Sequence, residues 1–427
     1  WKLNVIGSYQ LFNRDYYSTE RIQADAVGDW NRALNRLQTA EDYYSAQANL
    51  SGKIKTGKIS HQVLIGTDAD SYLNTNHTFN LNTAYDRINL LNPNKYNART
   101  DMPFAKDSLR TEAPTYRLGY YAQDLISLSE KVKVMAGLRW SYQKTQVSDI
   151  FNLISGAQTK GTAAAKADQA FSPKFGIVYQ PLKQMAVFAS YSNNFTVNSG
   201  IDVFDQALSP SIVDQFELGL KNDFLNGRLS ANFSLYKIIN NNLAQQAQYL
   251  RDGITVNTNT NIKELTGQTT SDGAELDISG TIVPGLYFIS GYSFNFMRYT
   301  KTSGLKGSYI EGERLVSNPA HTANASMFYT LSSGKLKGIK LGASAYYIGE
   351  RNAGWNNTYG QTQVGTRLIP MSGFTTVDLS LGYSIKKLSL LAKFSNIGNE
   401  LNYYVHENYS VNPIPPRQFL TTLSYKF

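Results

Sequence analysis

Apolar and polar side chains alternate along the last fifty residues of the chain. In the segment 377–384 the apolar positions are Val377, Leu379, Leu381 and Tyr383, and the polar or small positions between them are Asp378, Ser380, Gly382 and Ser384. The same period of two continues in 388–395 and again in 418–427. A period of two predicts β-strands with one apolar and one polar face.

Earlier segments carry the same pattern. We expect strands at 1–12, 45–55, 59–72, 115–128, 131–147, 171–181, 187–192, 213–224 and 228–239, after Pro284-Gly285, around 323–329 and at 339–348. Two segments, 13–42 and 73–114, read as long polar loops, and 30–37 within the first reads as a short helix. Asn226-Gly227 favours a tight turn with positive φ angles.

Strand length and connection length indicate the fold class. Alternating runs of about ten residues with aromatic ends are typical of outer-membrane barrels, in which short periplasmic turns alternate with long extracellular loops. Placing Phe427 at the periplasmic side puts every long connection outside. We therefore predict an all-β, transmembrane, antiparallel up-and-down β-barrel domain over residues 1–427, with about sixteen strands.

Composition narrows the functional classes. No run of eighteen apolar residues is present, which excludes a transmembrane helix, and no leader segment stands at Trp1. The chain has no Cys and four His, so thiolate sites are excluded and a histidine-built metal centre is disfavoured. Because no hydrolase, zinc-protease, P-loop or dinucleotide motif occurs, we expect no catalytic residues, no metal ligands and no enzyme activity.

The net charge of +9 has two interpretations. The positive side chains can be solvated in loops and contact anionic lipid headgroups, or they can attract an anionic ligand into a basic funnel. The aromatic content of 12% fits the two interfacial girdles of a barrel.

Several short sequences resemble TonB-dependent siderophore receptors. They are YYAQD at 120–124, AGLRW at 136–140, FSPKFGIVYQP at 171–181, DQFELGLK at 214–221, SDGAEL at 271–276, FTTVDL at 374–379, FSNIGN at 394–399 with Tyr403-Tyr404, and PRQF at 416–419. The resemblance implies a twenty-two-stranded barrel closed by an N-terminal plug. On this basis we expect the chain to be the C-terminal part of a longer protein, with the plug, the TonB box and the first strands upstream.

The resemblance also implies a function. Such a receptor binds a ferric siderophore at its extracellular face and imports it with energy from a TonB-ExbB-ExbD-type inner-membrane complex acting through the plug. Iron then arrives inside the chelate, so we expect no protein cofactor. The other expected partners are outer-membrane lipid and lipopolysaccharide, and we expect no nucleic-acid partner. Two alternatives stay open: a passive sixteen-stranded porin, and an importer of another bulky nutrient such as cobalamin or a glycan. The richness in Asn, Tyr and Lys is compatible with a Bacteroidota-like, Gram-negative source.

Two groups of candidate site residues follow. Aromatic and basic side chains in the last long loops could hold the organic shell of an anionic chelate, or could be girdle and loop-packing residues: Trp355, Tyr359, Arg351, Arg367, Tyr403, Tyr404, His406 and Tyr409. Charged positions on the polar face should line the lumen and face the plug, or simply be hydrated: Arg139, Lys174, Glu217, Lys221, Glu275 and Asp378.

Overall fold

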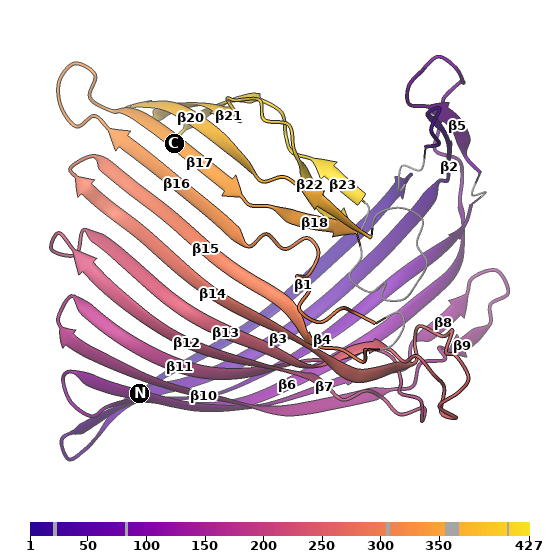
Figure 1. Ribbon diagram of the computed structural model, residues 1–427, viewed down its shortest axis with the longest axis horizontal. Helices are drawn as coiled ribbons and strands as arrows, with labels where there is room; N and C mark the ends of the chain where they lie inside the picture. Colours follow the sequence, from indigo (N-terminus) through magenta and orange to yellow (C-terminus); the bar gives the residue numbers. More distant parts are fainter. Residues whose placement is uncertain (20–23, 82–83, 305–307, 355–366, 408–409) are drawn as a thin grey trace. The chain divides into compact units, whose positions relative to one another are not determined.

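The computed structural model describes residues 1–19, 24–81, 84–304, 308–354, 367–407 and 410–427, and every regular element within them is a β-strand (Figure 1). Sixteen of these strands are eight residues or longer: β1 (Lys2–Ser18), β3 (Asn35–Thr56), β4 (Ile59–Asn80), β6 (Lys106–Ser127), β7 (Val132–Thr145), β10 (Lys166–Leu182), β11 (Met185–Thr196), β12 (Ser211–Phe224), β13 (Leu229–Gln246), β14 (Lys263–Val283), β15 (Leu286–Lys301), β16 (His321–Thr330), β17 (Ile339–Ile348), β20 (Phe374–Ile385), β21 (Leu388–Ser395) and β24 (Gln418–Tyr425). The sequence-based expectation of about sixteen strands agrees with this number.

The shorter strands lie in the long connections. They are β2 (Asp29–Arg32), β5 (Asp86–Asn89), β8 (Asp149–Asn152), β9 (Gln158–Lys160), β18 (Arg351–Gly354), β19 (Leu368–Met371), β22 (Tyr403–Glu407) and β23 (Ser410–Pro413). Three pairs of them form small antiparallel sheets of their own, β2 with β5, β18 with β19, and β22 with β23. Several long connections therefore contain regular β-structure of their own.

The chain divides into two compact units, 1–54 with 62–124 and 137–172, and 55–61 with 125–136 and 173–427. In the first unit β1 pairs with β3 in antiparallel register from Lys2↔Ser51 to Ser18↔Asn35, and β3, β4, β6 and β7 follow as successive neighbours. In the second unit the order is β10-β11-β12-β13-β14-β15-β16-β17-β20-β21-β24, each long strand being antiparallel to the next.

The pairing register separates two faces of the sheet in the second unit. Leu218, Leu235, Ala274 and Phe294 lie opposite one another on β12 to β15, and the next row holds Glu217, Tyr236, Gly273 and Asn295. Leu218 is 53% exposed, so the apolar row does not bury itself in a protein core. An exposed apolar face opposite a polar one is the arrangement that a transmembrane barrel requires.

Three strands of the first unit are much longer than a bilayer needs. β3, β4 and β6 have 22 residues each. A tilted strand crosses the hydrocarbon layer with about 9–11 residues. Roughly half of each strand therefore extends into water.

These extensions explain where the sequence-based prediction of loops was wrong. The predicted loop 13–42 contains the end of β1, all of β2 and the start of β3, and the predicted helix 30–37 is absent from it. The predicted loop 73–114 contains the end of β4, β5 and the first residues of β6. Outside the bilayer both faces of a strand meet water, so the apolar alternation that marks a membrane strand is lost.

The turn between β12 and β13 confirms the prediction of positive φ angles. Leu225, Asn226 and Gly227 have φ of 52°, 57° and 81°. Phe224 pairs with Leu229, so the connection has four residues rather than two.

Candidate ligand-binding face and polar wall

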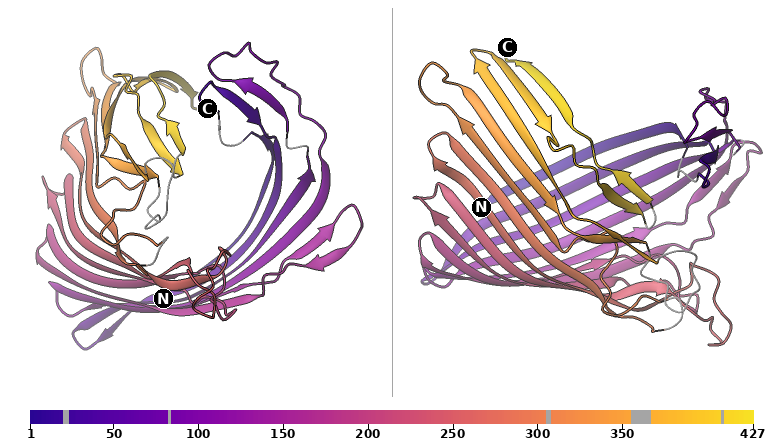
Figure 2. Two further views of the ribbon diagram at one scale, coloured as in Figure 1. Left: turned by 45° about the vertical axis from the view of Figure 1, so that its right-hand side comes forward. Right: turned by 45° about the horizontal axis from the view of Figure 1, so that its top comes forward.

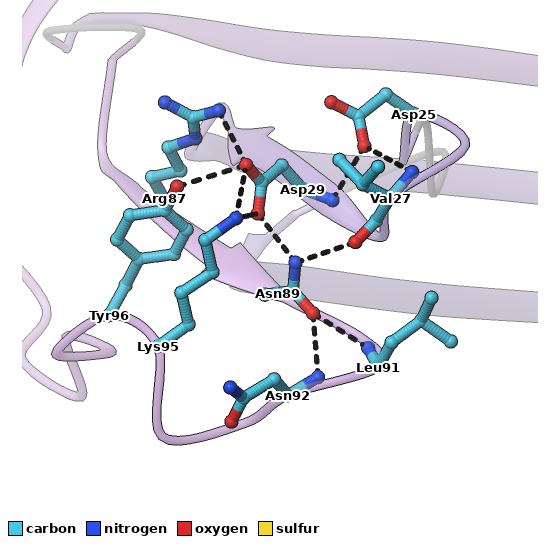
Figure 3. A network of polar contacts seen from close by, with 9 residues as sticks. All are labelled: Asp25, Val27, Asp29, Arg87, Asn89, Leu91, Asn92, Lys95 and Tyr96. Carbon is cyan, nitrogen blue, oxygen red and sulfur yellow. Dashed lines mark hydrogen bonds and ion pairs between the residues drawn. The ribbon is translucent and has the colours of Figure 1, made fainter.

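In the first unit, the connections β1–β3 and β4–β6 are joined by the β2–β5 strand pair and by the carboxylate of Asp29 (Figure 3). The Asp29 side chain is 7% exposed and accepts hydrogen bonds from Asn89 Nδ2 at 2.5 Å, Arg87 Nη2 at 2.7 Å, and Lys95 Nζ and Tyr96 OH at 2.9 Å each. The bonds from Asn89 and Lys95 hold the pKa of Asp29 well below its usual range. The carboxylate thus fixes two segments about sixty residues apart in sequence.

Asn89 extends this cluster through the backbone. Its Nδ2 also donates to Val27 O at 2.8 Å, and its Oδ1 accepts from the Leu91 and Asn92 amides. Nearby, Arg32 forms a two-bond ion pair with Asp86 and lies over the Tyr85 ring at 5.4 Å. We call residues 24–34 and 84–101 the Asp29 cap.

In the second unit, a buried arginine joins two small hairpins. Arg351 in β18 is 5% exposed; its Nη1 donates to Ser372 O at 3.1 Å and its Nη2 donates to Tyr403 O and to Asn402 Oδ1. Its guanidinium lies over the Phe374 ring at 5.4 Å, and burial lowers its pKa. Arg351 therefore connects the β18–β19 hairpin with the β22–β23 hairpin. The hydrogen-bond acceptors named here all belong to this chain.

Arg367 joins the same region to another connection. Its Nη1 and Nη2 lie 2.7 and 2.5 Å from Glu313 Oε2 and Oε1, an ion pair with two parallel bonds. Glu313 belongs to the β15–β16 connection, and the side chains of Arg367 and Glu313 are 28% and 12% exposed. Nearby, Ser317 N donates to Asn352 O at 2.7 Å. The β15–β16 and β17–β20 connections are thereby tied together.

The aromatic candidates divide between described and undescribed parts of the chain. Tyr403 and Tyr404 in β22 are 38% and 45% exposed, and Tyr404 meets Phe374 edge to face at 6.0 Å. His406 belongs to the same strand, while Trp355, Tyr359 and Tyr409 lie outside the described residues. The structure thus brings Arg351, Tyr403 and Tyr404 together, and their role in ligand binding stays a prediction.

On the polar face of the first unit, charged side chains of β6 and β7 form ion pairs with carboxylates of β4. Arg139 Nη1 and Nη2 lie 2.6 and 2.8 Å from the two oxygens of Asp68, and Arg139 Nε donates to Ser141 at 2.8 Å. Arg117 Nη1 lies 3.1 Å from Asp70 Oδ1, a single contact. Arg139 thus forms its hydrogen bonds with Asp68 and Ser141, which belong to strands of the same sheet.

The other five wall candidates are all in the second unit, and the register places them on one face of its sheet. Two rows of directly opposed residues show this: Ser190, Glu217, Tyr236 and Gly273, then Gly219, Ser234, Glu275 and Ser293. Lys174 and Lys221 share that face by alternation, as does Asp378, whose carboxylate binds Lys393 Nζ at 2.8 Å. Whether these side chains face a plug stays a prediction.

Three structurally important residues were missed from the sequence, namely Asp29, Glu313 and Asn396. Asn396 has φ of 48° and is 4% exposed; its side chain binds the backbone of Glu400 and Pro415, and its amide donates to Asp378 at 2.9 Å. It belongs to the FSNIGN segment, so the resemblance marked its position but not its role. Asp29 and Glu313 carried no sequence signal, since their partners lie more than fifty residues away.

The described residues show neither a membrane-spanning helix nor a metal-binding cluster. No helix there is long and apolar enough to cross a membrane. No group of three or more His, Asp or Glu side chains there is placed to hold a metal ion.

The two-faced antiparallel sheet, the short turns and the folded long connections define an outer-membrane β-barrel protein. The family described as "TonB dependent receptor-like, beta-barrel" matches residues 1–397. The chain belongs to this family and is therefore part of a barrel of the Gram-negative outer membrane.

Similar proteins agree with this assignment. The chain is 25% identical to the metal-pseudopaline receptor CntO of Pseudomonas aeruginosa, over 100% of the chain and 57% of that receptor. It is 26% identical to the ferrioxamine B receptor of Salmonella typhimurium, over 82% of the chain and 45% of that receptor. The chain thus spans about half the length of the curated relatives it matches.

A solved structure shows the same fold. The ferric-catecholate import receptor Fiu of E. coli K12, in its closed form, superposes with a TM-score of 0.81 at 20% identity, over 100% of this chain and 62% of that one. The likeness supports the barrel fold.

Proposed function

We propose that residues 1–427 form the barrel domain of a receptor that binds a ferric siderophore at its extracellular face. In this proposal a TonB-ExbB-ExbD-type complex supplies the energy through a plug domain. The observation that carries the proposal is the family match, together with relatives that are named as receptors for metal-pseudopaline and ferrioxamine B.

The geometry of the long connections supports a binding role. Hydrogen bonds and ion pairs fix the Asp29 cap in one unit and the Arg351 and Arg367 regions in the other. Fixed loops present side chains at low entropic cost, which favours binding of a bulky ligand. Tyr403 and Tyr404 are half-exposed on such a scaffold, so we propose them as contacts to the organic shell of the ligand.

Transport of radioactive iron tests the proposal. Cells that lack the gene, and cells that express it again, are given iron complexed to ferrioxamine B, to a catecholate and to a pyoverdine. The proposal expects expression to restore uptake of at least one chelate, and deletion of the energising complex to abolish that uptake. Uptake of every chelate at the same rate with and without the gene would contradict it.

The two alternatives give different results in the same experiment. A passive porin would let small solutes through at a rate independent of the energising complex. An importer of cobalamin or of a glycan would need that complex but would take up none of the iron chelates. The relatives named above favour iron or metal chelates over both alternatives.

A further inference from the structure

Lysines gather beside one another at the short-turn end of the last strands. Lys335 and Lys337 lie in the β16–β17 turn, Lys386 and Lys387 in the β20–β21 turn, and all four are exposed. The backbone connects these segments, since Lys426 N donates to Lys387 O at 2.8 Å and Ile339 pairs with Tyr383. The segments 331–345, 379–395 and 418–427 contain no Asp or Glu.

A groove lies on the apolar face of the same strands, which run side by side in orange and yellow in Figure 2. Its volume is about 480 Å³, and its lining is almost entirely apolar. Ala343 lies between Met327 and Leu379 in the register, and Ala392 lies beside Leu381, so small side chains alternate with large ones. This alternation of size hollows the lipid-facing surface.

The groove and the lysines are correctly spaced for one amphipathic ligand. Tyr329, Tyr383 and Tyr425 are exposed on the apolar face between them, as expected of an interfacial aromatic girdle. Ala343 is four residues from Ile339, where β17 begins next to the lysine turn, or about 13 Å along the strand. One leaflet of the hydrocarbon layer is about 15 Å deep.

We propose that this surface binds an anionic phospholipid of the periplasmic leaflet, with its phosphate at the four turn lysines and an acyl chain in the groove. The assignment to the periplasmic leaflet rests on the family, in whose barrels the short turns are periplasmic. Charge favours an anionic headgroup, since the turns carry four lysines and the strand segments around them contain no Asp or Glu. The apolar groove favours a lipid over a soluble polyanion, which would use the lysines alone.

Lipid binding to the purified, delipidated full-length protein tests the proposal. Native mass spectrometry in detergent compares phosphatidylglycerol with phosphatidylcholine of identical acyl chains. We expect a clear preference for phosphatidylglycerol, which salt weakens. The quadruple variant K335Q/K337Q/K386Q/K387Q should lose roughly tenfold or more in affinity for phosphatidylglycerol, with little change for phosphatidylcholine.

Two further variants separate the headgroup from the chain. Ala343→Phe, or Ala392→Leu if the first variant folds poorly, fills the groove and should lower retention of both lipids. The matched control K131Q/K183Q/R228Q removes three charges from other short turns and should leave the preference intact.

Equal affinity for the two headgroups in the unmodified protein would overturn the proposal. Unchanged phosphatidylglycerol binding in the quadruple variant would do so as well. If that variant instead lost binding only to peptidoglycan fragments or to an acidic periplasmic polypeptide, the lysines would bind that polymer. The assignment of a lipid ligand would then be wrong.

Discussion

The guanidinium of Arg139 lies against Gly119 and holds both oxygens of Asp68. The distances to the carboxylate are 2.6 and 2.8 Å, and a Cβ on Gly119 would come within 2.0 Å of Arg139 Nη2. The absence of a side chain at one strand position therefore permits an ion pair between its two neighbours.

Gly119→Ala should displace this guanidinium. The added carbon overlaps Arg139, so the Asp68 pair must open or shift, and we expect a loss of roughly 1–2 kcal/mol in unfolding free energy. Urea unfolding in lipid vesicles measures it. Gly137→Ala is the control, because its added Cβ would meet its nearest neighbours at 3.5 Å, an ordinary contact. Equal effects of the two substitutions would contradict the prediction.

Arg351→Lys should loosen the two hairpins that the guanidinium connects. An ammonium group cannot reach Ser372 O and Tyr403 O in the fork geometry of arginine, so buried carbonyls lose their donors at a cost of about 1–3 kcal/mol. Hydrogen exchange should become faster in 368–371 and 403–405. The exposed Arg251→Lys provides a control of the same chemistry, and unchanged exchange in the Arg351 variant would exclude the connector role.

The Asp29 cap should resist moderate acid. Because the pKa of Asp29 is lowered in the folded protein, its stabilising effect is complete above the ordinary aspartate pKa of about 3.9. That effect is lost as the pH falls through the lowered value. Limited proteolysis should therefore leave 84–101 intact at pH 5 and cleave it only in stronger acid.

Asp29→Asn isolates the contribution of this carboxylate. The variant removes the negative charge that Arg87 and Lys95 share, so the cap should be cleaved faster at pH 7 as well. Its cleavage should also lose the dependence on acid. An unmodified protein that opened between pH 7 and pH 5 would show that another group controls the cap.

A charge-swap cycle tests the pair of Arg367 and Glu313. Arg367→Glu and Glu313→Arg should each separate the β15–β16 and β17–β20 connections, whereas the double variant restores opposite charges. The pair is partly exposed, so we expect a coupling energy of roughly 1 kcal/mol. Additive losses in unfolding free energy would mean that the two connections are held by other contacts.

Tyr403→Ala and Tyr404→Ala test the proposed ligand-binding face. If the rings contact the cargo, each substitution should weaken chelate affinity about tenfold, as truncation of a contact tyrosine often does. Titration of the purified receptor with the chelate identified by uptake gives the affinity. Tyr425→Ala, at the opposite end of the strands, should leave it unchanged.

The alternation of side chains was sufficient to predict which residues share a face. The period of two predicts a shared polar face for five charged residues, and the register places all five on one face: Lys174, Glu217, Lys221, Glu275 and Asp378. This succeeds because strand geometry is local: neighbouring residues point to opposite sides whatever the rest of the chain does.

The folded connections could not be predicted in the same way. Asp29 depends on side chains about sixty residues further along the chain, and Arg351 on carbonyls twenty to fifty residues away. Backbone carbonyls carry no signature in the sequence, so Arg351 had the same appearance as an exposed ligand-binding arginine. Contacts of this kind are a property of the assembled fold.

The 22-residue lengths of β3, β4 and β6 have a mechanical consequence. Each projecting half is hydrogen-bonded to its neighbours and stands above the membrane as stiff sheet. If the chain acts as the proposed receptor, its ligand first meets a preformed, hydrogen-bonded β-sheet.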